Sequence, residues 1–170
     1  TVLSPAKTLD YSVNYTDKHT VPSFLPKSSQ LVKTLKAKEP SEIASLMGLS
    51  DKLASLNFDR YQSWNASKKL SNTAKPALLV FKGDVYQGLQ AEDFNKQDMT
   101  FAQKHLRILS GLYGALKPVD VMKPYRLEMG TTLQINGSKN LYEFWGDTVR
   151  DSVFCDSNPL INLASNEYCK

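Results

Sequence analysis

The sequence predicts an α/β protein, with α+β as the alternative, in which a mixed sheet is flanked by helices and a pair of short helices is inserted. Amphipathic stretches at helical spacing begin at residue 28 and continue beyond Asp51. Short apolar runs typical of buried strands recur at 1–3, 77–81 and 159–165. We expect a single domain over residues 1–170, since no linker or internal repeat divides the chain.

The N-terminal region begins with a strand and continues as a loop. Residues 1–3 are apolar and stop at a Ser-Pro step, and residues 11–27 are polar and contain prolines, which is typical of a loop. Leu31 and Leu35 then recur at helical spacing and predict a helix over residues 28–38.

A second and a third helix are predicted to follow. Ser41 has a side chain suited to an N-cap, with Glu42 in the first turn, where the helix dipole favours negative charge. The third helix is expected to begin near Asp51 and to bury Leu53 and Leu56.

The pattern changes after a basic loop over residues 65–76. The run Ala77–Phe81, bounded by proline and glycine, predicts a fully buried strand. A short helix is expected next, and Asp98 is expected to cap another that continues through Gln103. The remaining segments are interpreted as strands at 106–114, 125–130 and 131–135, a turn at 136–140, a helix at 141–153 and a buried strand at 159–165.

The net charge of +4 is concentrated in the first half of the chain. Residues 1–75 carry 11 Lys or Arg against 6 Asp or Glu, whereas residues 76–170 carry 10 against 11. This excess indicates either a solvated lysine face or a surface that contacts phosphate backbones. No apolar run approaches the roughly 20 residues of a membrane span, so we expect none.

The sequence lacks the residue patterns of several common metal, disulfide and catalytic sites. Two cysteines, Cys155 and Cys169, and two histidines, His19 and His105, form neither a disulfide framework nor a zinc signature, so we expect no metal site and no cofactor. No Ser-His-Asp, Walker or dinucleotide-binding pattern is present. Cytoplasm is the default compartment, with an organelle as the alternative if a transit peptide preceded Thr1.

Residues 39–57 contain the spacing of a helix-hairpin-helix. Its apolar-Gly-apolar turn is centred on Gly48, Ser50 is placed as the N-cap of the second helix, and Lys52 lies in its first turn. Free backbone N–H groups and the helix dipole at such a turn bind phosphate, which predicts non-specific, salt-dependent DNA binding supported by the flanking Lys68 and Lys69. The alternative is an ordinary turn between two helices with a C-cap glycine.

Polar residues follow three predicted strands and suggest a pocket for a small anionic ligand. The carboxyl ends of parallel strands share one edge of a sheet, where ligands bind. The candidate pocket residues are Lys7, Thr8, Lys82, Asp84, Tyr86, Arg107, Ser110, Arg126, Glu128, Ser165, Asn166 and Glu167.

The catalytic candidates within that pocket are Lys82, Asp84, Arg126 and Glu128, because cations bind phosphate or carboxylate and a buried carboxyl transfers protons. Arg126 and Glu128 are equally consistent with a buried ion pair, and Tyr86 with a core aromatic. No particular reaction follows from these residues.

The segments "SPAKTLDY", "FKGDVYQGLQAEDF", "FAQKHLRILSGLYGALKPVDVMKPYRLEMG", "LYEFWGD" and "INLASNEY" closely resemble the YaaA family of peroxide-stress-resistance proteins. The resemblance covers nearly the whole chain in order. Members of that family usually continue beyond "ASNEY" into a basic C-terminal third, which this sequence lacks.

The resemblance implies a YaaA-like fold with a helix-hairpin-helix, binding to duplex or distorted DNA, and a mostly cytosolic role in surviving hydrogen peroxide that is linked to low free iron. No reaction is firmly attached to the family. The leading hypothesis is therefore a DNA-binding stress protein. The alternatives are an enzyme acting on a small phosphorylated or nucleotide-like ligand, and a structural subunit of a larger assembly.

Overall fold

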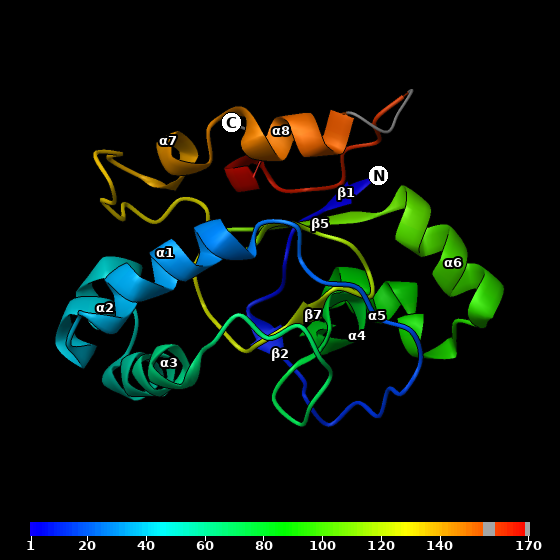
Figure 1. Ribbon diagram of the computed structural model, residues 1–170, viewed down its shortest axis with the longest axis horizontal. Helices are drawn as coiled ribbons and strands as arrows, with labels where there is room; N and C mark the ends of the chain where they lie inside the picture. Colours follow the sequence, from blue (N-terminus) through cyan, green and yellow to red (C-terminus); the bar gives the residue numbers. More distant parts are fainter. Residues whose placement is uncertain (155–158, 169–170) are drawn as a thin grey trace.

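The protein has a mixed α/β architecture, seen in a computed structural model that describes residues 1–154 and 159–168 (Figure 1). The α/β class is confirmed, but the strands of the described residues form three small sheets rather than one mixed sheet. The sheets consist of β1 (Val2–Leu3), β5 (Arg107–Ser110) and β6 (Gly114–Leu116); β2 (Thr8–Leu9) and β4 (Phe81–Lys82); and β3 (Lys75–Pro76) and β7 (Val121–Met122).

The first sheet lies at the centre of the molecule. β1 runs parallel to β5, and β5 pairs antiparallel with β6. The single strand predicted at 106–114 is confirmed only over Arg107–Ser110, because residues 111–113 turn the chain back into β6. The segment predicted as a buried strand at 159–165 adds only one bridge, between Val2 and Asn162. Ile161 and Leu163 are 56% and 62% exposed, so that prediction is wrong in both respects.

The apolar run 77–81 is buried as predicted but is not a strand. Residues Ala77–Val80 form one helical turn, α4, and only Phe81 enters β4. At the start of α4, the amide of Ala77 donates to the carbonyl of Asp120 and the amide of Leu78 donates to the carbonyl of Pro118. Periodicity alone does not separate a buried strand from a short buried helix.

The first two helices follow the predicted order with different boundaries. α1 (Leu25–Lys36) begins inside the predicted loop, because a proline in its first turn fits the start of a helix. α2 (Pro40–Met47) is capped by Glu39 rather than Ser41, and the reciprocal bonds of Glu39 and Glu42 form a capping box.

The third helix, α3 (Asp51–Ser63), begins where predicted but buries a different face. Leu53 and Leu56 are 39% and 44% exposed, whereas Ala54 and Tyr61 are buried. The hydroxyl of Tyr61 donates to the main-chain carbonyl of Arg126.

The middle of the chain contains α5 (Asp84–Leu89), a 3-10 turn at Ala91–Asp93 and α6 (Lys96–His105). The helix expected after residue 83 is confirmed. Asn95, not Asp98, caps α6: its Oδ1 accepts from the amides of Gln97 and Asp98, while Asp98 accepts in return from the Asn95 amide.

Residues 123–140 are irregular, so the two strands predicted at 125–130 and 131–135 are wrong. Their backbone groups bond within local turns or to side chains instead of to a neighbouring strand. The amide of Thr131 donates to the carbonyl of Glu128, and the exposed amide of Gly130 donates to Glu167 at 2.8 Å. The turn predicted at 136–140 is confirmed, with positive φ at Asn136 and Gly137.

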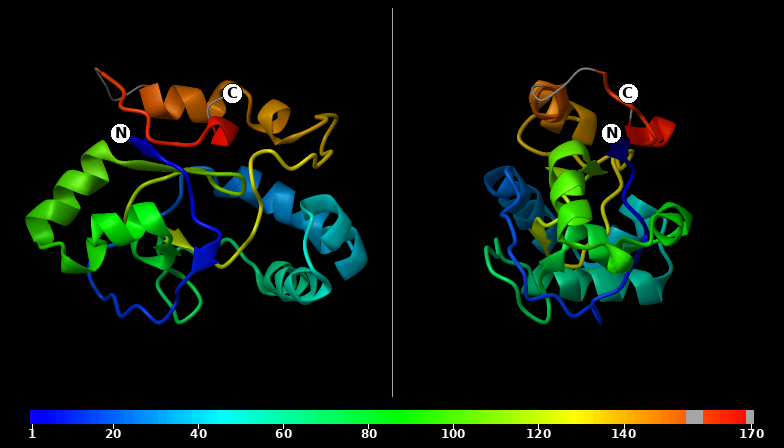
Figure 2. Two further views of the ribbon diagram at one scale, coloured as in Figure 1. Left: turned by 180° about the vertical axis from the view of Figure 1, so that it is seen from behind. Right: turned by 90° about the vertical axis from the view of Figure 1, so that its right-hand side faces the viewer.

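The predicted helix at 141–153 is divided at Gly146, whose φ of 49° ends α7 (Leu141–Trp145) before α8 (Asp147–Phe154) begins. Both helices lie on one side of the central sheet (Figure 2), where Val153 packs in a cluster with Val2 and Leu109. η2 (Asn166–Tyr168) follows on the same side. Both cysteines lie outside the described residues.

In the described part of the chain, no helix combines the length and the apolar character needed to cross a membrane.

Candidate functional site

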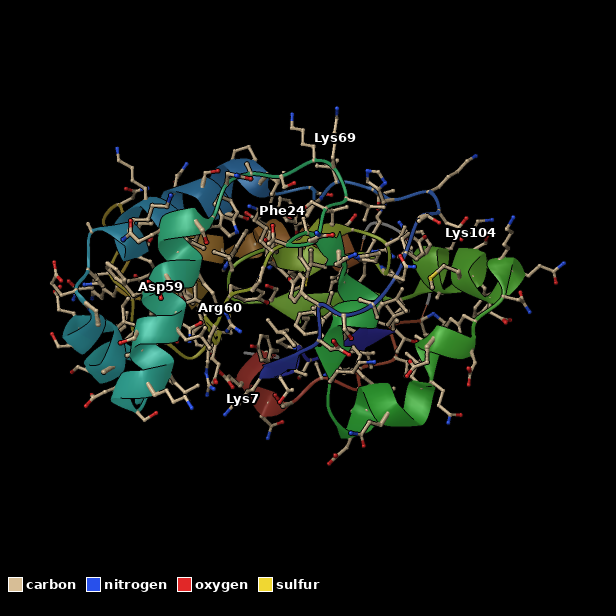
Figure 3. All side chains as sticks on the ribbon, turned by 90° about the horizontal axis from the view of Figure 1, so that it is seen from below. Lys7, Phe24, Asp59, Arg60, Lys69 and Lys104 are labelled. Atoms are coloured by element: carbon tan, nitrogen blue, oxygen red, sulfur yellow. The ribbon has the colours of Figure 1, made fainter. Side chains whose placement is uncertain are left out.

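A cavity of about 150 Å³ lies where three segments that are distant in sequence meet. Residues 4–7 lead from β1 towards β2, residues 125–128 belong to the irregular segment, and residues 165–168 include η2. Figure 3 shows Lys7 beside that last segment, on the face of the molecule that also carries α3. The lining residues are Ser4, Pro5, Ala6, Lys7, Tyr125, Arg126, Leu127, Glu128, Ser165, Glu167 and Tyr168.

Two cations share one carboxylate oxygen in this cavity. Oε1 of Glu128 lies 2.9 Å from the Arg126 guanidinium and 3.3 Å from Nζ of Lys7. The Arg126 side chain is 20% exposed, that of Glu128 is 32% exposed and that of Lys7 is 67% exposed. The cluster therefore extends from a mostly buried guanidinium to a lysine in solvent.

Neutral hydroxyl groups form the wall and floor of the cavity. Oγ of Ser4 accepts from the amide of Ser165 at 2.8 Å, and the Ser4 carbonyl accepts from the Tyr86 hydroxyl at 2.7 Å. Burial raises the pKa of Tyr125 and of Tyr168, and the charge of Glu167 raises the Tyr168 pKa further. Both phenols therefore remain protonated in the physiological range.

A third cation, Arg60 of α3, is seen in the same view as Lys7 (Figure 3). Its guanidinium donates to Oδ1 of Asn57 at 3.3 Å. Burial lowers the pKa of Arg60, and the positive charge of Arg126 acts in the same direction. The next residue of α3, Tyr61, donates to the carbonyl of Arg126, so this part of α3 lies against the segment that carries Arg126.

Of the predicted pocket residues, the structure brings five together around the cavity, namely Lys7, Arg126, Glu128, Ser165 and Glu167. Three others lie on the neighbouring β2–β4 ribbon and after it. Thr8 pairs with Lys82 across that ribbon, Lys82 forms an ion pair with Glu92 at 3.5 Å, and Asp84 begins α5.

The remaining four predicted pocket residues lie behind or away from the lining. Tyr86 and Ser110 are buried beneath it, and Oγ of Ser110 is 2.6 Å from the Tyr125 hydroxyl. Arg107 lies at the opposite end of β5, where it donates to main-chain carbonyls at the end of α6. Asn166 lies between two lining residues in η2 without lining the cavity itself.

A second candidate surface is the turn between α2 and α3. Gly48 has φ 60° and ψ 45° as the C-cap of α2, and its amide donates to the carbonyl of Ala44. Ser50 is the N-cap residue of α3, but its side chain makes no capping hydrogen bond. Lys52 is exposed in the first turn of α3.

The two lysines predicted to flank this turn lie at the other end of α3. Lys68 and Lys69 are exposed in the loop that follows the helix, and 13 helical residues span about 20 Å. Figure 3 shows Lys69 on a different side of the molecule from Lys7. These lysines therefore do not gather with Gly48, Ser50 and Lys52.

Sequence reasoning missed three residues of these surfaces. Ser4 and Tyr168 belong to the same polar segments as Lys7 and Glu167, so their neighbourhood in sequence was an available signal. Arg60 had no such signal, because its approach to Arg126 depends on how α3 packs. Within the described residues, His, Cys, Asp and Glu side chains form no group of three that would hold a metal ion.

Comparison with known proteins gives consistent matches. The family model described as "Peroxide stress protein YaaA" matches residues 1–170. A UPF0246 protein of Hahella chejuensis is 54% identical over 175 residues, covering 99% of this chain and 68% of that protein. A UPF0246 protein of Marinomonas sp. is 51% identical over 173 residues, covering 99% of this chain and 66% of that protein. The chain thus spans about two thirds of the length of these relatives.

Proposed function

The chain belongs to the peroxide stress protein YaaA family, and on that premise we propose that it binds DNA non-specifically through a helix-hairpin-helix over residues 39–57. In this role it limits the oxidative damage that free iron causes during hydrogen peroxide stress. The link to iron rests on the family resemblance, whereas the DNA contact has support in particular residues.

The observation that carries the proposal is the open start of α3. Because the Ser50 side chain makes no cap, the first amides of α3 lack both an intrahelical acceptor and a side-chain acceptor. The left-handed Gly48 turns the chain so that α3 starts three residues later. Amides at a helix start, the positive end of the dipole and Lys52 together favour a phosphate.

A contact of this kind reaches only the DNA backbone. It fixes the position of the protein on the duplex and carries no sequence information. Its affinity falls as salt rises, because each neutralised phosphate releases counterions.

The experiment that tests the proposal compares Lys52→Ala with Lys104→Ala. Lys104 is an exposed lysine on α6, distant from α3 (Figure 3), so both variants lose one surface charge. Fluorescence anisotropy with a labelled duplex at several salt concentrations should show that Lys52→Ala weakens binding about three- to tenfold and reduces the salt slope by about 1. Lys104→Ala should change neither; equal losses in both variants, or no loss in either, would contradict the hairpin contact.

A second candidate function is action on a small phosphorylated or nucleotide-like ligand. It is favoured by one observation, the convergence of Lys7 and Arg126 on a cavity with hydroxyl-bearing walls.

A further inference from the structure

We propose that the cavity between residues 4–7, 125–128 and 165–168 binds a terminal phosphate monoester, with Arg126 and Lys7 as its cationic anchors and Glu128 as an internal carboxylate that the ligand displaces. The site is separate from the hairpin, and the inference rests on the second candidate function above, for which it names the chemical group that is bound.

Charged side chains of both signs line the cavity. Two cations, Lys7 and Arg126, and two carboxylates, Glu128 and Glu167, line it. Glu167 is held by the amide of Gly130, whereas Glu128 is bonded to the two cations themselves. Glu128 therefore occupies the place of an anion, and an incoming anion competes with it.

The N–H donors of Arg126 match the oxygens of a phosphate. A guanidinium presents a planar fork of N–H groups that suits phosphate oxygens, and Arg126 uses one of its terminal nitrogens for Glu128. A monoester carries about −1.5 to −2 charges at neutral pH, more than a carboxylate or a phosphodiester. It is therefore the anion best able to displace the Glu128 carboxylate.

The volume of the cavity limits the size of the group that it can hold. A volume of about 150 Å³ equals that of roughly five water molecules in the liquid. This volume has room for a phosphate group. The rest of the ligand lies outside the mouth, where Lys7 is exposed.

Two sources supply this chemistry, namely a free nucleoside monophosphate and the phosphorylated end of a DNA strand. The second source fits the position of α3, because Lys52 and Arg60 are eight residues apart on that helix, a rise of about 12 Å. A strand held at the hairpin would reach the cavity within a few nucleotides. The DNA-end source rests on the DNA binding proposed above, and the mononucleotide source does not.

The first experiment measures binding of a nucleoside monophosphate, the matching nucleoside and inorganic phosphate by calorimetry. The monophosphate should bind and the nucleoside should not. Glu128→Gln should bind the monophosphate about three- to tenfold more tightly, because the internal competitor loses its charge. Arg126→Lys should bind about tenfold more weakly, because it keeps the charge but loses the fork.

The matched control is Glu92→Gln, which removes the carboxylate of the Lys82–Glu92 ion pair outside the cavity. It should leave affinity unchanged. Thermal midpoints of all variants identify any that fail to fold. Weaker or unchanged monophosphate binding in a folded Glu128→Gln protein would overturn the proposal, since no purely structural role of Glu128 predicts tighter binding.

The second experiment compares duplexes that end in a 5′-phosphate, a 3′-phosphate or hydroxyl groups only. If a strand end is the source, Glu128→Gln strengthens binding of a phosphorylated duplex alone, while Lys52→Ala weakens all three alike. Loss of the Lys52 effect would therefore refute the hairpin and leave the cavity standing. If neither phosphorylated ends nor the monophosphate bind better than their hydroxyl counterparts, the cavity proposal is refuted.

Discussion

Gly111→Ala is expected to lower the thermal midpoint by about 10 °C or more. A Cβ at this position would overlap the carbonyl oxygen of Leu127 and lie 3.0 Å from its carbonyl carbon. Because both partners are backbone in a buried region, neither can turn aside as a side chain would. A cost of a few kcal/mol corresponds to a shift of this size in a domain of this length.

The control for this prediction is Gly88→Ala. An added Cβ at Gly88 meets nothing within 4 Å, and the residue lies inside α5, so the change should be neutral or stabilising by up to about 1 kcal/mol. Differential scanning calorimetry of both variants decides the point. An equal thermal midpoint for Gly111→Ala and the wild type would show that the β5–β6 turn does not pack closely on Leu127. That packing could then not be what positions Arg126 and Glu128.

The second large effect is expected at Gly48, where aspartate should weaken duplex binding about tenfold or more while asparagine largely preserves it. An added Cβ has open space there, so the cost to the fold comes only from φ 60°. Asparagine and aspartate both tolerate the left-handed region better than other residues with a Cβ. The two variants therefore differ mainly by one negative charge beside the proposed phosphate.

Anisotropy titrations at low and moderate salt would measure this difference, with thermal midpoints of the two variants expected to agree closely. The gap between aspartate and asparagine should narrow as salt rises, because salt screens exposed charges. Equal affinity of both variants and the wild type would place the DNA contact elsewhere. Equal loss in both would attribute the effect to the backbone conformation of the turn rather than to charge.

Sequence reasoning succeeded where structure depends on neighbouring residues. Helical spacing located α1 and α3, and glycine punctuation located the end of β5 and the turn at 136–137. It failed where packing decided. Phe81 alone of the run 77–81 reached a strand. Leu53 and Leu56 face outward, whereas Ala54 and Tyr61 of the same helix are buried in the core.

The candidate site residues likewise fall into those placed by neighbouring residues and those placed by tertiary packing. Gly48, Ser50 and Lys52 are close in sequence, so their turn and its free amides follow from local backbone geometry and were predictable from the sequence alone. The sequence also carried enough of the family's residues to identify the family.

Only the tertiary structure decided which distant charges meet. It brought Lys7 and Arg126 to one oxygen of Glu128, added Arg60 from α3, and left Arg107 at the far end of β5. Local hydrogen bonds and caps depend on a few adjacent residues. A shared ion pair between remote segments depends on how the whole core packs, and no local pattern encodes it.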